Sequence, residues 1–277
     1  MGKIRMVAFD IDGTLLTSDD RILPSTLDAV EKARRRNVIV TLCTGRNYNF
    51  VTEILKTLGI EDMPIVSNNG AVVLDDKKTY VYHAVGLRPL QRVFSIAKET
   101  GIPAFGFNDR ELIGARNEKT LERCEFWRGR SGGKKFPLEM VATILDSYEQ
   151  IEDLLGANSC KMLLSPDTKE EFDYCMEHMT DLDEVRRTNC FQYDIDVFST
   201  ETSKGTAIRD LAKHYGIGMN EVMTFGDGEN DMEMINVAGV GVAMGNGAPL
   251  LKKAADFIAP SNDDGGIMFA MRDFGVI

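Results

Sequence analysis

Residues 4–16 read IRMVAFDIDGTLL, and this stretch decides the fold. Ile4 to Phe9 form a largely apolar run of strand length, which predicts a buried strand. The run ends at two aspartates and a glycine, residue types that are typical of a turn. Ligands of open α/β sheets bind at the carboxyl ends of the strands. Asp10 and Asp12 are therefore candidates for chemistry.

Apolar runs bounded by turn residues recur in both outer portions of the chain, and they predict further buried parallel strands. They are Val38 to Cys43, Ile65 to Ser67, Val222 to Phe225, Val240 to Ala243 and Phe257 to Ala259. A helix is predicted over residues 23–37, with Pro24 in its first turn and a basic last turn. Two more are predicted at Tyr48 to Leu58 and Lys204 to Tyr215, each followed by glycine. We expect an α/β fold with a doubly wound, mostly parallel, Rossmann-like sheet.

The middle of the chain has a different pattern. Helical patterns at Arg88 to Thr100 and Ser147 to Leu155 alternate with predicted strands near Lys161 to Leu164 and Gln192 to Phe198, which indicates an inserted α+β cap domain. We place the catalytic core at residues 1–84 and 190–277 and the cap at residues 85–189. The basic, glycine-rich segment from Arg128 to Pro137 is either a solvated surface loop or a loop that faces substrate.

Composition narrows the classes of function. The 277 residues carry a formal net charge of −11, and no run of Lys and Arg stands out, so we expect no nucleic-acid partner. The five cysteines have no paired spacing, which favours reduced thiols over disulfides or a zinc site. The N-terminus lacks a signal-peptide pattern and no apolar run has membrane-spanning length. We expect a cytoplasmic protein with no membrane contact, and no obligatory protein partner is evident.

The two aspartates after the first strand can divide labour. Asp10 is placed to act as nucleophile and metal ligand, and Asp12 as the acid that protonates a leaving oxygen and later activates water. Backbone N–H groups of the turn can bind phosphate oxygens. The alternative is a turn in which both side chains only cap backbone donors.

Two further stretches offer donors to a phosphate. In LCTGRN, residues 42–47, Thr44 supplies a hydroxyl and Gly45 an unhindered N–H. Lys204 begins a helix, where a cation opposes the helix dipole unless a phosphate or the Asp10 carboxylate favours it there. The alternatives are a helix N-cap for the first stretch and a solvated surface lysine for the second.

FGDGENDMEM, residues 225–234, follows another predicted strand. Asp227 can complete an oxygen-rich Mg²⁺ site with Asp10, and Asn230 can donate to phosphate or substrate. Asp231 can hold a metal-bound water. The alternative is an acidic turn that caps the next helix, which suits Asp231 in particular.

Taken together, FDIDGT, the Thr44-Gly45 pair, Lys204 and GDGEND resemble, in order and spacing, the four motifs of the haloacid dehalogenase superfamily. Aspartate at both positions of the first motif resembles its phosphatases. SNNGA (residues 67–71), LCTGR, DIDVFSTETSKG and APSNDDGG (residues 259–266) resemble its Cof-type branch, subfamily IIB, with a subtype-B class-two cap. The resemblance implies a Mg²⁺-dependent phosphatase of sugar phosphates, nucleotides or cofactor phosphates that forms an aspartyl-phosphate.

The resemblance also implies roles for individual residues. Asp10 is the nucleophile and Asp12 the acid and base. The Asp10 side chain, the Asp12 backbone carbonyl and Asp227 bind Mg²⁺. Donors to the phosphate are the Ile11 N–H, Thr44, Gly45, Lys204 and Asn230.

Two alternative functions stay open, a phosphosugar mutase and a non-catalytic phosphometabolite sensor. The resemblance also implies that the cap sets specificity. We assign no role to Arg110, Arg116, Arg128, Lys161 or Trp127, for which surface charge or, for Trp127, packing is the simpler interpretation.

Overall fold

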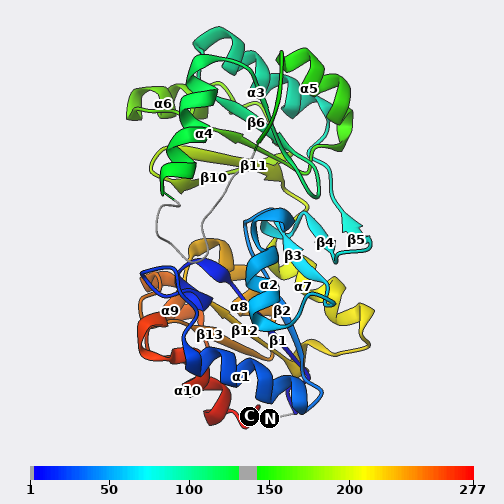
Figure 1. Cartoon of the computed structure of the whole chain (residues 1–277), viewed down its shortest axis with the longest axis vertical. Helices are drawn as coiled ribbons and strands as arrows, with labels where there is room; N and C mark the ends of the chain where they lie inside the picture. Colours follow the sequence, from blue (N-terminus) through cyan, green and yellow to red (C-terminus); the bar gives the residue numbers. More distant parts are fainter. Residues whose placement is uncertain (1–2, 131–141) are drawn as a thin grey trace.

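The structure is a computed structural model that describes residues 3–130 and 142–277, without the side chains of residues 127–130 and 189–191. The segment from Arg128 to Pro137 lies outside the described residues, apart from the backbone of residues 128–130. Figure 1 shows the chain as two stacked bodies of strands and helices.

A five-stranded sheet forms the lower body in Figure 1, and all of its strand pairs are parallel. Its strands, in spatial order, are β14 (Phe257–Ile258), β13 (Val240–Ala243), β12 (Val222–Gly226), β1 (Met6–Phe9) and β2 (Ile39–Leu42). Every residue of β13, β12 and β1 is buried, as expected of strands that helices cover on both faces. The strands predicted at these five places are confirmed.

Helices cover both faces of this sheet because successive side chains of a strand point in opposite directions. Val7 and Phe9 share an apolar cluster with α1 and α10, whereas Met6 and Ala8 pack in a second cluster with α7. The helices around the sheet are α1 (Pro24–Arg35), α2 (Thr52–Leu58), α7 (Lys204–His214), α8 (Met232–Val237), α9 (Pro249–Ala254) and α10 (Gly266–Asp273). The predicted doubly wound α/β sheet is confirmed.

The predicted strand at Ile65–Ser67 exists as β3, but its expected place in the parallel sheet was wrong. β3 pairs antiparallel with β4 (Val72–Leu74), which pairs with β5 (Thr79–Tyr82) in a separate three-stranded sheet. An isolated parallel bridge between Cys43 and Val66 is its link to the end of β2. The tight turn at residues 68–70 reverses the chain and brings β4 alongside β3. The prediction missed this pairing because a short apolar run does not reveal the direction of the neighbouring strand.

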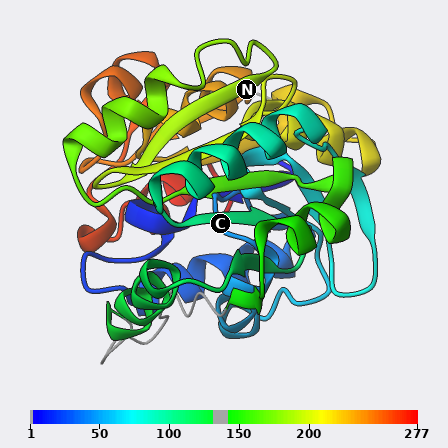
Figure 2. The ribbon, with the colours of Figure 1, turned by 90° about the horizontal axis from the view of Figure 1, so that it is seen from above.

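The upper body is built on a six-stranded sheet in which β7 and β8 are parallel and the other pairs antiparallel. Its strands, in spatial order, are β10 (Val185–Phe191), β11 (Asp194–Ser199), β9 (Lys161–Leu164), β6 (Ala104–Phe107), β7 (Leu112–Ala115) and β8 (Ala142–Leu145). The helices of this body are α3 (Leu87–Thr100), α4 (Glu118–Arg130), α5 (Tyr148–Leu155) and α6 (Lys169–Glu177). Viewed from above, this body overlies the parallel sheet (Figure 2). We call it the cap.

The predicted domain boundary between residues 189 and 190 falls inside β10, and β11 also pairs within the six-stranded sheet. We therefore propose that the cap extends to Ser199 and that the chain returns to the parallel sheet just before α7. This proposal differs from the predicted boundary because the polar motif that leads into Lys204 is continuous with β11 in the sequence, so no change of pattern marks the end of the cap.

Short helical turns connect these elements: η1 (Ile11–Leu15), η2 (Tyr48–Phe50), η3 (Asn68–Gly70), η4 (Gly156–Asn158), η5 (Met219–Glu221), η6 (Glu229–Asp231) and η7 (Asn262–Asp264). Cys43, Cys124, Cys160 and Cys175 are buried. Within residues 3–130 and 142–277, the helices are too short or too polar to cross a bilayer.

Candidate active site

Three neighbouring strands of the parallel sheet have their carboxyl ends side by side. Phe9 of β1 lies opposite both Leu42 of β2 and Phe225 of β12, so the residues after these strand ends are brought close together. They include Asp10, Thr44 and Asp227. Lys204, the first residue of α7, follows the cap in the sequence, and its side chain reaches Asp10 at the carboxyl end of β1. Residues predicted from separate stretches of sequence therefore converge.

Lys204 is the centre of the cluster. Its Nζ lies 2.5 Å from Asp10 Oδ1 and 2.6 Å from Asp231 Oδ1. The lysine side chain is 1% exposed, and those of Asp10 and Asp231 are 9% and 0% exposed. These contacts explain why a cation begins a helix against its dipole. The interpretation as a solvated surface lysine is wrong.

Burial and charge act in opposite directions on this pair. Burial raises the pKa of Asp10 well above its usual value, and the charge of Lys204 opposes that rise. Burial alone would lower the pKa of Lys204, but the Asp10 and Asp231 carboxylates outweigh it and raise that pKa. Lys204 is therefore a permanent cation in the site, and it favours the ionised form of Asp10.

Asp231 divides its two oxygens between the lysine and the backbone. Oδ1 accepts from Lys204, while Oδ2 accepts the N–H groups of Asp227 and Gly228, each at 2.9 Å. Asp231 therefore fixes the loop that carries Asp227. Its position agrees with a supporting role behind the metal ligands, and it also has the loop-capping role that was the alternative.

Carboxylate oxygens of Asp10, Asp227 and Asp231 lie within 4.8 Å of one another. Several hard oxygen donors around one point suit a hard divalent cation such as Mg²⁺, so the donor set fits the expected metal. Thr14 Oγ1 donates to Asp227 Oδ1 at 2.8 Å and orients it. Burial raises the pKa of Asp227 to about 6. A metal ion would reverse that shift, because it favours the carboxylate.

Gly13 allows the turn after β1 to approach Asp227. Its φ is +79°, a conformation that glycine adopts without strain. A Cβ at this position would lie 2.3 Å from Asp227 Oδ2, so any side chain would collide with the carboxylate. The glycine of the FDIDGT stretch is thus required by both backbone conformation and space.

Asp12 lies apart from the cluster of carboxylates and pairs with Arg46. Arg46 Nε donates to Asp12 Oδ2 at 2.9 Å and Nη2 to Oδ1 at 2.5 Å, a bidentate contact that fixes the carboxylate plane. The arginine side chain is 5% exposed and that of Asp12 is 53% exposed. Arg46 was missed from the sequence, although it follows directly after the Thr44-Gly45 pair in LCTGRN.

Apart from Lys204, the expected phosphate-binding residues lie in the segments that follow β1, β2 and β12. Thr44 is buried, and its Oγ1 accepts from the Arg46 N–H at 3.1 Å, which leaves its own hydroxyl hydrogen for another acceptor. Ile11 is buried and follows Asp10 directly in the turn. Asn230 Nδ2 donates to Asn69 Oδ1 at 3.1 Å.

Two cap residues reach the same loops. Lys161 Nζ donates to the Gly45 carbonyl at 3.1 Å and lies 3.3 Å from Asp196 Oδ1. Both side chains are nearly buried, so the interpretation of Lys161 as a surface charge was wrong. Lys161 begins the otherwise apolar strand β9, but its burial depends on the pairing of β9 with β11, which that strand alone does not reveal.

The other cap residues considered from the sequence lie elsewhere. Arg110 donates to the Asp75 carbonyl at 2.8 Å and stacks on the Tyr48 ring, so it joins the cap to the lower body. Arg116 forms an exposed pair with Asp146. The side chains of Trp127 and Arg128 lie outside the described residues.

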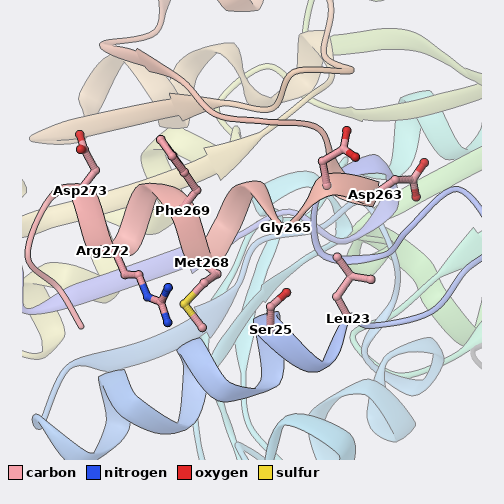
Figure 3. Close-up of a pocket in the computed structure, with 9 residues that line it drawn as sticks. Leu23, Ser25, Asp263, Gly265, Met268, Phe269, Arg272 and Asp273 are labelled. Atoms are coloured by element: carbon pink, nitrogen blue, oxygen red, sulfur yellow. The ribbon is translucent and has the colours of Figure 1, made fainter.

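A surface hollow of about 890 Å³ lies at α10 and the start of α1, as Figure 3 shows. Its nine lining residues include Leu23, Met268, Phe269 and Arg272. None of these lining residues is among the predicted site residues. The lining of the hollow is mixed apolar and charged, and it lacks the cluster of polar groups found at the carboxyl ends of β1, β2 and β12. We therefore propose that the active site lies at the carboxyl ends of β1, β2 and β12.

Comparisons with known proteins identify the family of this chain. The model of the haloacid dehalogenase-like hydrolase family matches residues 7–271. Phosphatase YwpJ of Bacillus subtilis (strain 168) is 25% identical over 283 residues, which cover 97% of this chain and 99% of the relative.

Two solved structures of phosphatases resemble this chain over nearly its full length. The subclass IIB sugar phosphatase BT4131 is 26% identical, with a TM-score of 0.81 over 99% of this chain and 100% of the other. BT1666 from Bacteroides thetaiotaomicron, a phosphatase of the same superfamily, is 25% identical, with a TM-score of 0.80 over 99% of this chain and 96% of the other. The likeness therefore extends over the cap as well as the parallel sheet.

Proposed function

Because this chain belongs to the haloacid dehalogenase-like hydrolases, we propose that it is a Mg²⁺-dependent phosphatase of a small phosphorylated metabolite, with an aspartyl-phosphate intermediate. The chain is a phosphatase of this superfamily. The metal, the nucleophile and the metabolite class are our proposal. One observation supports them most: the carboxylates of Asp10, Asp227 and Asp231 meet the ammonium group of Lys204 at one strand edge.

Asp10 is the proposed nucleophile. Lys204 binds its Oδ1 at 2.5 Å and fixes the carboxylate at the end of β1. A carboxylate oxygen of Asp10 attacks the phosphorus, and the ester P–O bond breaks with its electron pair on the leaving oxygen. Water then attacks the phosphorus, which releases inorganic phosphate and restores the Asp10 carboxylate.

Asp12 is the proposed acid and base. It gives a proton to the leaving oxygen in the first step and takes one from the attacking water in the second. The bidentate contact with Arg46 fixes the plane of the Asp12 carboxyl group. To carry a proton, Asp12 must loosen one of these two contacts. Arg46 therefore sets the orientation in which Asp12 gives and takes a proton.

The charge of the phosphoryl group requires several partners. Mg²⁺ held by the side chains of Asp10 and Asp227 and the backbone carbonyl of Asp12, with Asp231 behind them, would neutralise part of it. Lys204 supplies a further positive charge. The proposed donors to the phosphoryl oxygens are the Ile11 N–H, the Thr44 hydroxyl, the Gly45 N–H and the Asn230 amide.

The cap is proposed to cover the site and contact the leaving group. Its Lys161 already reaches the Gly45 carbonyl at 3.1 Å, so it lies beside the proposed phosphate donors. Closure of this kind excludes bulk water, which would otherwise weaken the electrostatic contacts. We propose a sugar phosphate, a nucleotide or a cofactor phosphate as the substrate.

Release of inorganic phosphate from a panel of sugar phosphates, nucleotides and pyridoxal phosphate tests this function, with and without Mg²⁺. We expect turnover of at least one compound and loss of that turnover when EDTA removes the metal. Folded protein without turnover of the entire panel would refute the metabolite class. Turnover that persists in EDTA would refute the metal requirement.

A further inference from the structure

Asn69 occupies an unusual position between the cap and the parallel sheet. It lies in the turn η3 between β3 and β4, is 5% exposed, and has a φ of +56°. Asparagine tolerates this left-handed conformation, but glycine adopts it more easily. The backbone alone therefore does not require an asparagine at this position, and its side-chain contacts supply another reason.

Both ends of the Asn69 amide are used. Oδ1 accepts from Asn230 Nδ2 at 3.1 Å, and Nδ2 donates to Asp196 Oδ2 at 3.3 Å. An ionised carboxylate only accepts hydrogen bonds, so the Asp196 contact requires the nitrogen of Asn69 on that side. The oxygen then faces Asn230 and must receive its N–H. Asp196 thereby fixes the orientation of two successive amides.

Asp196 belongs to β11 of the cap, and a second contact holds it in place. Lys161 Nζ lies 3.3 Å from Asp196 Oδ1, with both side chains nearly buried. The same Nζ donates to the Gly45 carbonyl at 3.1 Å and lies 4.4 Å from the Phe107 ring centroid. The chain of contacts thus begins at Asn230 and ends at Gly45, two proposed phosphate-binding residues, and passes through the cap.

We propose that Asn69 is a positioning residue that holds the Asn230 amide ready for phosphate when the cap's Asp196 is seated against it. This inference rests on the proposed function, because it takes Asn230 as a phosphate donor. One N–H of the Asn230 amide is bound to Asn69, and the second is left for a phosphoryl oxygen. Without Asp196 the Asn69 amide is free to turn over, and Asn230 loses its fixed orientation. Cap closure therefore completes the phosphate site.

A double-mutant cycle tests this link. The affinity of inorganic phosphate is measured by calorimetry in the presence of Mg²⁺ for Asn69→Gly, Asn230→Ala and the double variant. Glycine suits the positive φ, so Asn69→Gly removes the side chain without backbone strain. We expect Asn69→Gly to weaken phosphate binding about tenfold, and the double variant to bind within about twofold of Asn230→Ala. Independent effects that multiply in the double variant would overturn the proposal.

Asn68→Gly is the matched control. Asn68 precedes Asn69 in the same turn, is also buried, and has a φ of +49°. It contacts the cap through Cys160, whose Sγ lies 3.4 Å from its Nδ2. We expect phosphate affinity within about threefold of wild type, since one weak hydrogen bond away from the phosphate is lost. A loss equal to that of Asn69→Gly would mean that the turn only packs against the cap, and would overturn the proposal.

Exchange of the two side chains provides a rescue. Asn69→Asp alone places two carboxylates together and should weaken phosphate binding. Asn69→Asp combined with Asp196→Asn reverses donor and acceptor but keeps an acceptor facing Asn230. We expect the combined variant to recover most of the affinity that Asn69→Asp loses. A combined variant as weak as Asn69→Asp would overturn the proposal.

Kinetics separate this inference from the proposed function. For the substrate that the wild type hydrolyses fastest, Asn69→Gly should lower kcat/KM in the same proportion as phosphate affinity. Wild-type protein that binds phosphate but hydrolyses none of the panel would refute the function, and the calorimetric cycle would still decide the role of Asn69. Wild-type protein that does not bind phosphate would overturn the role of Asn69 as well.

Discussion

Lys204 Nζ lies 2.5 Å from Asp10 Oδ1, although 194 positions separate the two residues in the sequence. The lysine also binds Asp231, so one buried cation serves two buried carboxylates. With Asp227 alongside, negative charge exceeds positive charge at this edge of the sheet. A bound divalent cation would offset this excess negative charge. An acidic protein can therefore accept a phosphate dianion at this site.

Replacement of Lys204 by methionine should destabilise the protein in a pH-dependent way. Methionine leaves Asp10 and Asp231 buried without a cation, which costs about 3–5 kcal/mol near neutral pH. Burial then raises the pKa of Asp10 without the opposing charge of Lys204. Its protonation at lower pH removes part of the cost, so the loss should be smaller at pH 5 than at pH 7.

Urea unfolding of Lys204→Met at both pH values measures this effect, with the metal removed. Lys169→Met is the control, because Lys169 forms an exposed pair with Asp173. Its free energy of unfolding should change by no more than about 0.5 kcal/mol. A Lys204→Met protein as stable as wild type at pH 7 would contradict the buried contact.

Replacement of Asp10 by asparagine should abolish turnover while the fold is retained. An amide is a poor nucleophile, so no aspartyl-phosphate forms. Phosphate release is measured for the best substrate, and mass spectrometry of the trapped intermediate reports on the covalent step. Asp28→Asn, at an exposed ion pair on α1, should keep full activity. Normal turnover by Asp10→Asn would eliminate the proposed mechanism.

The chain positions of the main site residues could be predicted because local features define them. Asp10 and Asp227 each follow a buried strand, and Lys204 begins a helix, so their place at the strand edge follows from the sheet. The parallel order of strands then requires that these positions meet. The predicted sheet and its site were therefore accessible from patterns in single segments.

Relationships between side chains of different segments were not accessible in this way. The Arg46 contact with Asp12 depends on how two loops face each other. Burial of Lys161 depends on the pairing of β9 with β11, which no periodicity within one strand reveals. The antiparallel pairings of β3 with β4 and of β10 with β11 were missed for a different reason. Each strand pairs with the next strand along the chain, and the pattern of one short strand does not reveal the direction of that neighbour.

Asp227→Asn should stabilise the metal-free protein at neutral pH. Burial raises the pKa of Asp227 from 3.8 to about 6. Between these pH values the folded state binds more protons than the unfolded state, so stability falls as pH rises through this window. Above this pH window, the buried Asp227 carboxylate lowers the free energy of unfolding by a constant amount. Asparagine removes that cost, which we expect to raise the free energy of unfolding by about 1–2 kcal/mol at pH 7, after a discount for partial exposure.

Thermal unfolding with and without Mg²⁺ measures both parts of this prediction. Ligand binding to the folded state raises the Tm of the wild type, whereas Asp227→Asn should show little Mg²⁺-dependent rise. Asp263→Asn, at a carboxylate in the turn η7, should keep the wild-type rise. An Asp227→Asn protein with a full Mg²⁺-dependent rise would show that the metal binds elsewhere.

Arg46→Lys should impair hydrolysis of esters with poor leaving groups more than esters with good ones. Lysine keeps the charge but cannot hold both oxygens of Asp12, so the carboxyl group loses its fixed orientation. Proton donation by a positioned acid is worth about 10²–10⁴-fold in rate. We expect kcat/KM, which reports on the steps up to departure of the leaving group, to fall at least about tenfold for an alkyl phosphate, a part of that factor. For 4-nitrophenyl phosphate, kcat/KM should fall far less, because 4-nitrophenolate leaves without a proton.

The measurement is the ratio of kcat/KM for the alkyl phosphate to kcat/KM for 4-nitrophenyl phosphate, since a general loss of structure lowers both values together. Arg116→Lys is the matched control, because Arg116 pairs with Asp146 on the exposed surface of the cap. It should leave the ratio unchanged. If Arg46→Lys lowers kcat/KM equally for both substrates, Arg46 acts on the phosphoryl group or on the fold, and proton donation by Asp12 does not depend on it. A ratio of alkyl phosphate to 4-nitrophenyl phosphate that falls in Arg46→Lys but not in Arg116→Lys would show that Arg46 positions Asp12 as the acid, as the bidentate contact requires.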